Sequence, residues 1–184
     1  GVTRASRRAT LSFALPARVA ARPVEVGDAV HAGEIVARLD DREFRLAESA
    51  ANAVLAELEA RTAQARRDVE RAERLAAARA ATAEEVEQLR ASATALEAAR
   101  DAAAARLAET RRLLSETDLV APFAATVTAV HVEPGEWAGP GTPVVELAGD
   151  GGLEVVVEAP EGVRAHLVEG AEVVVELPFL DRRV

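Results

Sequence analysis

Apolar side chains in the middle of the chain recur at the spacing of an α-helix. Residues 41–116 contain no glycine and no proline, and are dominated by the strong helix formers Ala, Glu, Arg and Leu. Steps of three and four alternate in two series, a pattern that predicts coiled-coil helices. The first series is Phe44, Ala47, Ala51, Val54, Leu58, Thr62, Ala65, Val69, Ala72 and Ala76, and the second is Val86, Leu89, Ala93, Leu96, Ala103, Leu107, Thr110 and Leu114.

Each series contains one irregularity. The step from Leu58 to Thr62 makes two spacings of four in succession, which we interpret as a local stutter. In the second series Arg100 falls on the expected seam, so we expect Ala99 to take its place there.

A turn is expected between the two series, at Ala78 to Ala81. Thr82 is followed three residues later by Glu85, which is the pattern of a capping box, and Val86 then begins the second series. Two antiparallel arms of roughly 35 residues, each about 50 Å long at 1.5 Å per residue, would result. Because no glycine marks the turn, one continuous helix is the alternative.

Short strands are predicted on both sides of this helical region. Asp40 and Asp41 are expected to cap the first helix, and Pro122 requires extended backbone after the second. The predicted strands are Leu11–Val19, Val24–Val26, Ile35–Leu39, Thr126–Val132 and Val144–Leu147.

One short motif occurs twice, once in each flank. The segment that starts at Gly27 returns at Gly135 with a constant offset of 108. The turn residues of the two copies are Gly27, Asp28, Gly33, Gly135 and Gly141. We therefore expect residues 11–40 and 119–148 to fold into a single β domain whose two turns are related by a pseudo-twofold axis.

The chain is thus predicted to be an α+β protein, in which a split β domain carries an inserted antiparallel helical hairpin. After a linker at Gly149–Gly152, the predicted strands Leu153–Glu158 and Ala171–Leu177 are too few for a stable domain, so they indicate part of a β-barrel. The predicted parts are residues 1–40 and 118–148 for the two halves of the β domain, 41–117 for the hairpin and 149–184 for the partial barrel.

Composition excludes several classes of function. The net charge of −9 argues against nucleic acid as a partner, and the absence of cysteine excludes disulfides and thiolate metal sites. No apolar run approaches the length of a transmembrane helix. The chain contains no Met, even at its start, so we expect it to be an internal piece of a longer protein.

No catalytic or metal-binding pattern is present. His31, His131 and His166 are scattered and lack a metal-ligand spacing with carboxylates, and no serine has a His and Asp pattern beside it. Trp137, the only tryptophan, is interpreted as a packing anchor beside its turn. We expect neither an enzyme nor a bound metal.

The order of these parts resembles the periplasmic adaptors, or membrane fusion proteins, of tripartite efflux pumps of the RND and HlyD type. The segments that carry the resemblance are Leu11–Phe13, Val26–Gly33, Leu39–Asp40 and, most specifically, Asp118–Phe123. The split β domain resembles a lipoyl or biotinyl carrier domain. A membrane-anchored or lipidated N-terminus and a membrane-proximal domain, which the family usually has, are missing from this sequence.

The resemblance implies an adaptor in the periplasm, attached to the inner membrane by a segment outside this chain. Its partners would be an inner-membrane transporter, of the RND or the ABC type, and a TolC-like outer-membrane channel, with the adaptor itself forming a ring, expected to be a hexamer. Carrier domains attach lipoate or biotin to a lysine, and this chain has none, so a carrier-enzyme subunit is excluded and no cofactor is expected. A freestanding coiled-coil scaffold is the other alternative.

The resemblance also implies a channel-docking motif at the hairpin tip. Family members carry an Arg, a Leu four residues later and a Ser seven residues after that, and Arg71, Leu75 and Thr82 match this spacing, with Thr in place of Ser. Arg71 would offer a planar fork of donors, Leu75 an apolar knob and Thr82 a hydroxyl. The alternative is that the spacing is a coincidence in an Arg-rich helix and that Thr82 only caps the second helix.

Overall fold

The computed structural model describes residues 2–149, 151–156, 176–177 and 182–183. The chain divides into two compact units, one of residues 7–150 and one of residues 1–6 with 151–184. Within the described residues, every helix is too polar or too short to cross a bilayer.

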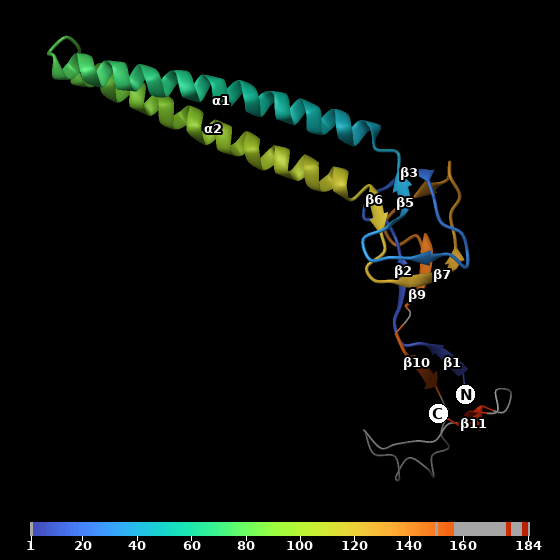
Figure 1. Ribbon diagram of the computed structural model, residues 1–184. Coiled ribbons are helices and arrows are strands. Elements are labelled where there is room, and N and C mark those ends of the chain that lie inside the picture. The colour runs from blue at the N-terminus through green and yellow to red at the C-terminus, as the bar shows by residue number, and fades with distance from the viewer. Residues whose placement is uncertain (1, 150, 157–175, 178–181, 184) are drawn as a thin grey trace. The chain divides into compact units, whose positions relative to one another are not determined.

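Two long antiparallel helices dominate the larger unit (Figure 1). Helix α1 spans Arg42–Ala77, with 36 residues, and helix α2 spans Ala83–Ser115, with 33 residues. At 1.5 Å per residue both are about 50 Å long. The prediction of a helical hairpin is confirmed, and the alternative of one continuous helix is wrong.

The seam between the helices follows an unbroken alternation of four and three. Ala47 and Val54, which were assigned to the seam, are exposed. Glu48 and Leu55 take their places, so the stutter expected after Leu58 is absent. The buried and half-buried positions of the seam are Phe44, Glu48, Ala51, Leu55, Leu58, Thr62, Ala65, Val69, Ala72 and Ala76 on α1, and Val86, Leu89, Ala93, Leu96, Arg100, Ala103, Leu107, Thr110 and Leu114 on α2.

Side chains of the opposite helix account for this choice. Leu55 buries more apolar area than Val54 would, which favours Leu55 at the seam. Glu48 accepts a hydrogen bond from Nε of Arg111 at 3.0 Å, so its carboxylate is paired where it meets α2.

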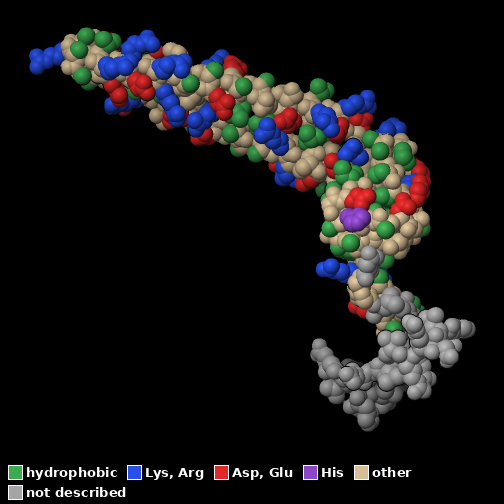
Figure 2. All heavy atoms as spheres, in the orientation of Figure 1, with side chains coloured by type: hydrophobic (Ala, Val, Ile, Leu, Met, Phe, Trp, Pro, Cys, Tyr) green, Lys and Arg blue, Asp and Glu red, His purple; other side chains and the backbone are tan. Residues whose placement is uncertain are grey.

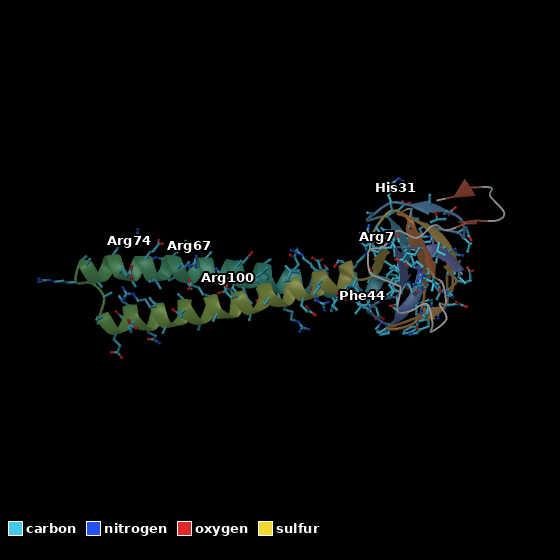
Figure 3. All side chains as sticks on the ribbon, turned by 90° about the horizontal axis from the view of Figure 1, so that it is seen from below. Arg7, His31, Phe44, Arg67, Arg74 and Arg100 are labelled. Atoms are coloured by element: carbon cyan, nitrogen blue, oxygen red, sulfur yellow. The ribbon has the colours of Figure 1, made fainter. Side chains whose placement is uncertain are left out.

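Arg100 remains on the seam, contrary to the expectation that Ala99 would replace it. Ala99 is exposed, whereas Arg100 is half-buried and lies along the hairpin in Figure 3. Its guanidinium donates to Oδ1 of Asp101 at 2.6 and 3.0 Å. A long arginine stem can cover apolar surface while its charged head stays at the edge, which explains how the seam accepts it.

The strands on either side of the hairpin form two four-stranded antiparallel sheets with one shared core. The first sheet has the order β2 (Arg8–Leu11), β9 (Val145–Gly149), β7 (Ala125–Val130) and β4 (Ala29–Val30). The second has the order β6 (Asp118–Val120), β5 (Ile35–Leu39), β3 (Ala17–Ala21) and β8 (Trp137–Ala138). Phe13, Val19, Val36, Leu39, Val127, Val144, Val145 and Leu147 are among the fully buried core residues.

The two sheets are related by the offset of 108. Strand β4 pairs with β7 through Ala29 and Thr126, and strand β8 pairs with β3 through Trp137 and Arg18. Adding 108 to Ala29 gives Trp137, and subtracting 108 from Thr126 gives Arg18. Each half of the β unit therefore supplies the two edge strands of the sheet whose central strands belong to the other half, so neither half is complete alone.

Three local expectations for the strands and the first cap are corrected. The predicted strand Leu11–Val19 is interrupted, because β2 ends at Leu11 and β3 begins after Pro16, which has no backbone N–H to give to a ladder. Val24–Val26 is not a strand, although Val24 is buried in the core. Asp41 occupies the N-cap of α1, but its side chain forms no capping hydrogen bond and instead pairs with Arg45.

The smaller unit contains two short strand pairs in its described residues. Strand β1 (Val2–Ala5) pairs antiparallel with β10 (Leu153–Val156), and β11 (Glu176–Leu177) pairs with β12 (Arg182–Arg183). Residues 157–158 and 171–175 of the predicted strands lie outside the described residues. Val2–Ala5, which the sequence division placed in residues 1–40, thus belongs to the same unit as β10. The division into the four residue ranges stays a prediction.

Candidate docking site at the hairpin tip

The turn at the hairpin tip is made by a Schellman motif with arginine where glycine is usual. After α1 ends, Arg79 has a positive φ of 59°, alone among the described non-glycine residues. The N–H of Ala80 donates to the carbonyl of Leu75 at 2.8 Å, and the N–H of Arg79 donates to that of Ala76 at 2.9 Å. These bonds satisfy the carbonyls of Leu75 and Ala76 in the last turn of α1, and the chain reverses without a glycine.

A capping box then begins α2, as the sequence predicts. The N–H of Glu85 donates to Oγ1 of Thr82 at 3.2 Å, and the N–H of Thr82 donates to Oε2 of Glu85 at 2.8 Å. The backbone hydrogen bond from Thr82, reinforced by its side chain, lowers the pKa of Glu85.

The three residues of the docking motif lie at this end of the hairpin. Arg71 and Leu75 are four residues apart on one face of the last turns of α1, and Thr82 is the N-cap of α2. Leu75 is 45% exposed, and Arg71 forms an exposed ion pair with Asp68 at 3.4 Å. Within the described part of the chain, no hydrogen bond or ion pair joins any two of the three. The three side chains therefore lie separately on the surface of the tip and do not form a preassembled cluster.

Ion pairs between the helices hold the hairpin behind this surface. Arg90 donates to Glu73 at 2.6 Å near the tip, and Arg66 donates to Glu97 at 2.7 Å farther back. Both are exposed, so solvent screening keeps their contribution to folding small. Such cross-helix pairs were not predicted, because they depend on the register of two segments that are distant in sequence.

Trp137 is not the packing anchor that the sequence suggested. It is 69% exposed, whereas its neighbour Ala138 on β8 is fully buried, because successive side chains of a strand point to opposite faces. Trp137 lines an open groove of about 460 Å³ at the base of α1, together with Leu46, which is 71% exposed.

The predicted turn residues of the β unit have the backbone that such turns need. Gly27, Gly33, Gly135 and Gly141 all have positive φ, between 79° and 98°. The carboxylate of Asp28 accepts a hydrogen bond from the N–H of Glu25 at 2.7 Å and so closes the first turn.

The histidines form only local pairs in the described residues. His131 Nε2 lies 2.9 Å from Glu146, and His31 Nδ1 lies 3.3 Å from Glu34. Contact with the N–H and the ring of His31 lowers the pKa of Glu34. His166 lies outside the described residues, and within them no group of His, Asp and Glu is arranged to hold a metal ion.

Comparisons with known proteins agree with this architecture. No protein-family model matches the chain. It is 30% identical over 142 residues to the uncharacterized protein YdhJ of Escherichia coli strain K12. The aligned residues are 77% of this chain and 50% of YdhJ, so the chain spans half the length of that curated relative.

Two solved structures show the fold. The membrane fusion protein Spr0693 from Streptococcus pneumoniae R6 has a TM-score of 0.73 at 20% identity, covering 91% of this chain and 70% of that one. The periplasmic adaptor protein EmrA has a TM-score of 0.55 at 15% identity, covering 79% of this chain and 73% of that one. The predicted fold class, a helical hairpin inserted into a split lipoyl-like unit, is confirmed.

Proposed function

We propose that this chain, which has the fold of the periplasmic adaptors or membrane fusion proteins, is a nonenzymatic adaptor of a tripartite efflux pump. In this function it connects an inner-membrane transporter to a TolC-like outer-membrane channel across the periplasm. The transporter in this proposal is of the RND type, and an ABC-type transporter is the alternative.

The exposed tip is the observation that carries this proposal. Leu75 presents an apolar side chain beside the turn, and Arg71 lies on the same face one turn away. The tip ends a hairpin whose other end is joined to the β unit through β5 and β6 (Figure 1). A rod fixed at one end, with an apolar and cationic surface at the other, suits a protein that reaches a distant partner.

Self-association into a ring is the second part of the proposal. A shallow, mostly apolar groove of about 330 Å³ runs along the base half of the hairpin. Its lining includes Ala47, Ala50, Val54, Ala103 and Arg106. Val54 is 51% exposed there, because the seam uses Leu55 instead. A neighbouring hairpin packed along this groove would cover that apolar surface, as expected for a ring of adaptors, with a hexamer as the proposed number.

The competing readings are less well supported. A freestanding coiled-coil scaffold does not need flanking strands, yet here strands from both flanks share two sheets and one core. A carrier-enzyme subunit needs a lysine to hold its prosthetic group, and the chain has none.

The direct test is Arg71→Asp in the full-length protein, expressed in its own host. Arg61→Asp is a matched control, since Arg61 is on the same helix, its side chain is 63% exposed against 64% for Arg71, and each forms one ion pair within α1. We expect Arg71→Asp to abolish crosslinking of the tip to the outer-membrane channel and efflux-dependent resistance, while folding and transporter binding are retained. Reversal of a charge at a desolvated contact costs several kcal/mol, about 2–5. Unchanged crosslinking and resistance would leave Thr82 as a helix cap only.

A further inference from the structure

The arginines of the hairpin differ in whether a carboxylate accompanies them. Nine of them form ion pairs with Asp or Glu. Four form none within the described residues, namely Arg67, Arg74, Arg79 and Arg106. Three of these four lie in the tip half of the hairpin, where Figure 3 labels Arg67 and Arg74 and Figure 2 shows basic side chains at the free end.

Arg79 is the most unusual of these residues, because its backbone is strained. A left-handed φ of 59° is unfavourable for an L-residue other than Asn or Asp, whereas glycine, the common residue at this position of a Schellman motif, adopts it freely. Its side chain is exposed and makes no hydrogen bond or ion pair in the described structure that could repay this cost. A residue that is unfavourable for folding at an exposed turn points to a role outside folding.

The charges around the turn leave this cation uncompensated. Glu73 is held by Arg90, and Glu85 is held in the capping box. Glu84 lies in the first turn of α2, where the helix dipole favours an acid. Arg74 lies in the last turn of α1, where the helix dipole favours a base. Helix stability is therefore enough to explain Arg74. The same dipole also acts at Arg79, just beyond the C-cap Ala78, but it does not explain the left-handed backbone that glycine would adopt without strain.

We propose that Arg79, assisted by Arg74, contacts carboxylates on the rim of the outer-membrane channel. This inference rests on the proposed function and adds contact residues that the Arg71, Leu75 and Thr82 pattern does not contain. The guanidinium group binds carboxylates through two parallel N–H donors, which gives both strength and orientation. Arg79 is exposed and lies in the turn between α1 and α2, at the end of the hairpin opposite the β unit.

The test combines stability and docking, because the two readouts move in opposite directions. Arg79→Gly is expected to raise the thermal midpoint of the full-length protein by relieving the backbone, and to reduce crosslinking to the channel about tenfold, which is the loss expected for a hydrogen-bonded charge contact. Arg79→Lys keeps the charge and the strain, so it is expected to retain most of the crosslinking. The photo-crosslinking residue is placed at Ala80, and the product is identified by mass spectrometry.

The outcomes separate this inference from the proposed function. If Arg71→Asp abolishes crosslinking but Arg79→Gly leaves it unchanged, the inference is overturned and the proposed function stands. If the unmodified tip forms no product with the channel, both fall. The inference is supported if the crosslinked channel peptide contains Asp or Glu and if changing that acid to Arg restores docking of Arg79→Glu.

Discussion

Gly27 and Gly135 make the same hydrogen bond in the two halves of the β unit. The N–H of Gly27 donates to the carbonyl of Val127, the N–H of Gly135 donates to that of Val19, and both distances are 2.8 Å. The φ values are 97° and 98°. The partners exchange under the offset of 108, so each half supplies a glycine turn that closes on the core strand of the other.

This relationship predicts equal costs for two distant substitutions. An added Cβ would have no heavy atom within 4 Å at either glycine. Gly27→Ala and Gly135→Ala should therefore each lower the free energy of unfolding only by the strain of a left-handed alanine, about 1–2 kcal/mol. Urea unfolding measures the loss. Gly139→Ala is the control, since Gly139 lacks a positive φ and its added Cβ would meet Pro16 at an ordinary 3.5 Å, so we expect a change near zero. Clearly unequal costs at the two turns would contradict the equivalence.

A second prediction concerns the seam of the hairpin. Leu107 is 4% exposed and Leu58 is half-buried, so Leu107→Ala is expected to cost more than Leu58→Ala, within the range of about 2–5 kcal/mol for buried leucines and with Leu58 at its low end. Leu46→Ala removes an equally large side chain that is 71% exposed and is expected to change stability little. Thermal unfolding followed by circular dichroism at the helix band is the measurement. A Leu58→Ala protein as stable as the parent would show that Leu58 does not pack at the seam.

The base of α1 should respond to acid. The side chain and then the N–H of Arg42 bond to the carboxylate of Asp40 and lower its pKa from 3.8 to about 2. Because the folded state holds the ionised form, this contribution to stability is complete above pH 3.8 and is lost as the pH falls through about 2. A carboxyl NMR titration should place Asp40 near 2, and Arg42→Gln should return it toward 3.8. A midpoint near 3.8 in the unchanged protein would mean that the pair does not form in solution.

Trp137 offers a fluorescence test of the outer face of the β unit. As the only tryptophan, 69% exposed, it should emit like a solvated indole and be quenched by acrylamide almost as efficiently as a free tryptophan amide. Unfolding in urea should then change the emission maximum little. A blue-shifted, protected emission from the monomer would restore the original interpretation of Trp137 as a packed residue.

The sequence predicted the large features of the fold because they depend on local spacing. The repeat at Gly27 and Gly135 indicated one β unit, and Thr82 with Glu85 indicated where α2 begins. The details that it missed depend on distant partners. In an alanine-rich helix, Val54 and Leu55 are nearly equivalent candidates for the seam, and only pairing across the helices, as between Glu48 and Arg111, distinguishes them.

The candidate site was predictable to a different extent. Arg71, Leu75 and Thr82 were found by their spacing, but nothing in the sequence marks Arg79, because a left-handed arginine is not a recognised turn signal. Trp137 was misjudged because a two-residue strand such as β8 has too few positions to show which face is buried.

The junction between the hairpin and the β unit has a consequence for how such chains vary. Arg38 pairs with Asp118 in the ladder of β5 and β6, and the N–H of Leu39 donates to the carbonyl of Thr117 at 2.9 Å. The chain therefore leaves and re-enters the β unit through adjacent strands, so the unit closes irrespective of how many residues intervene. Since the seam repeats every seven residues, adding or removing one heptad from each arm would change the reach by about 10 Å at 1.5 Å per residue. The length of the hairpin can therefore change to match the distance between its partners while the β unit that carries it stays the same.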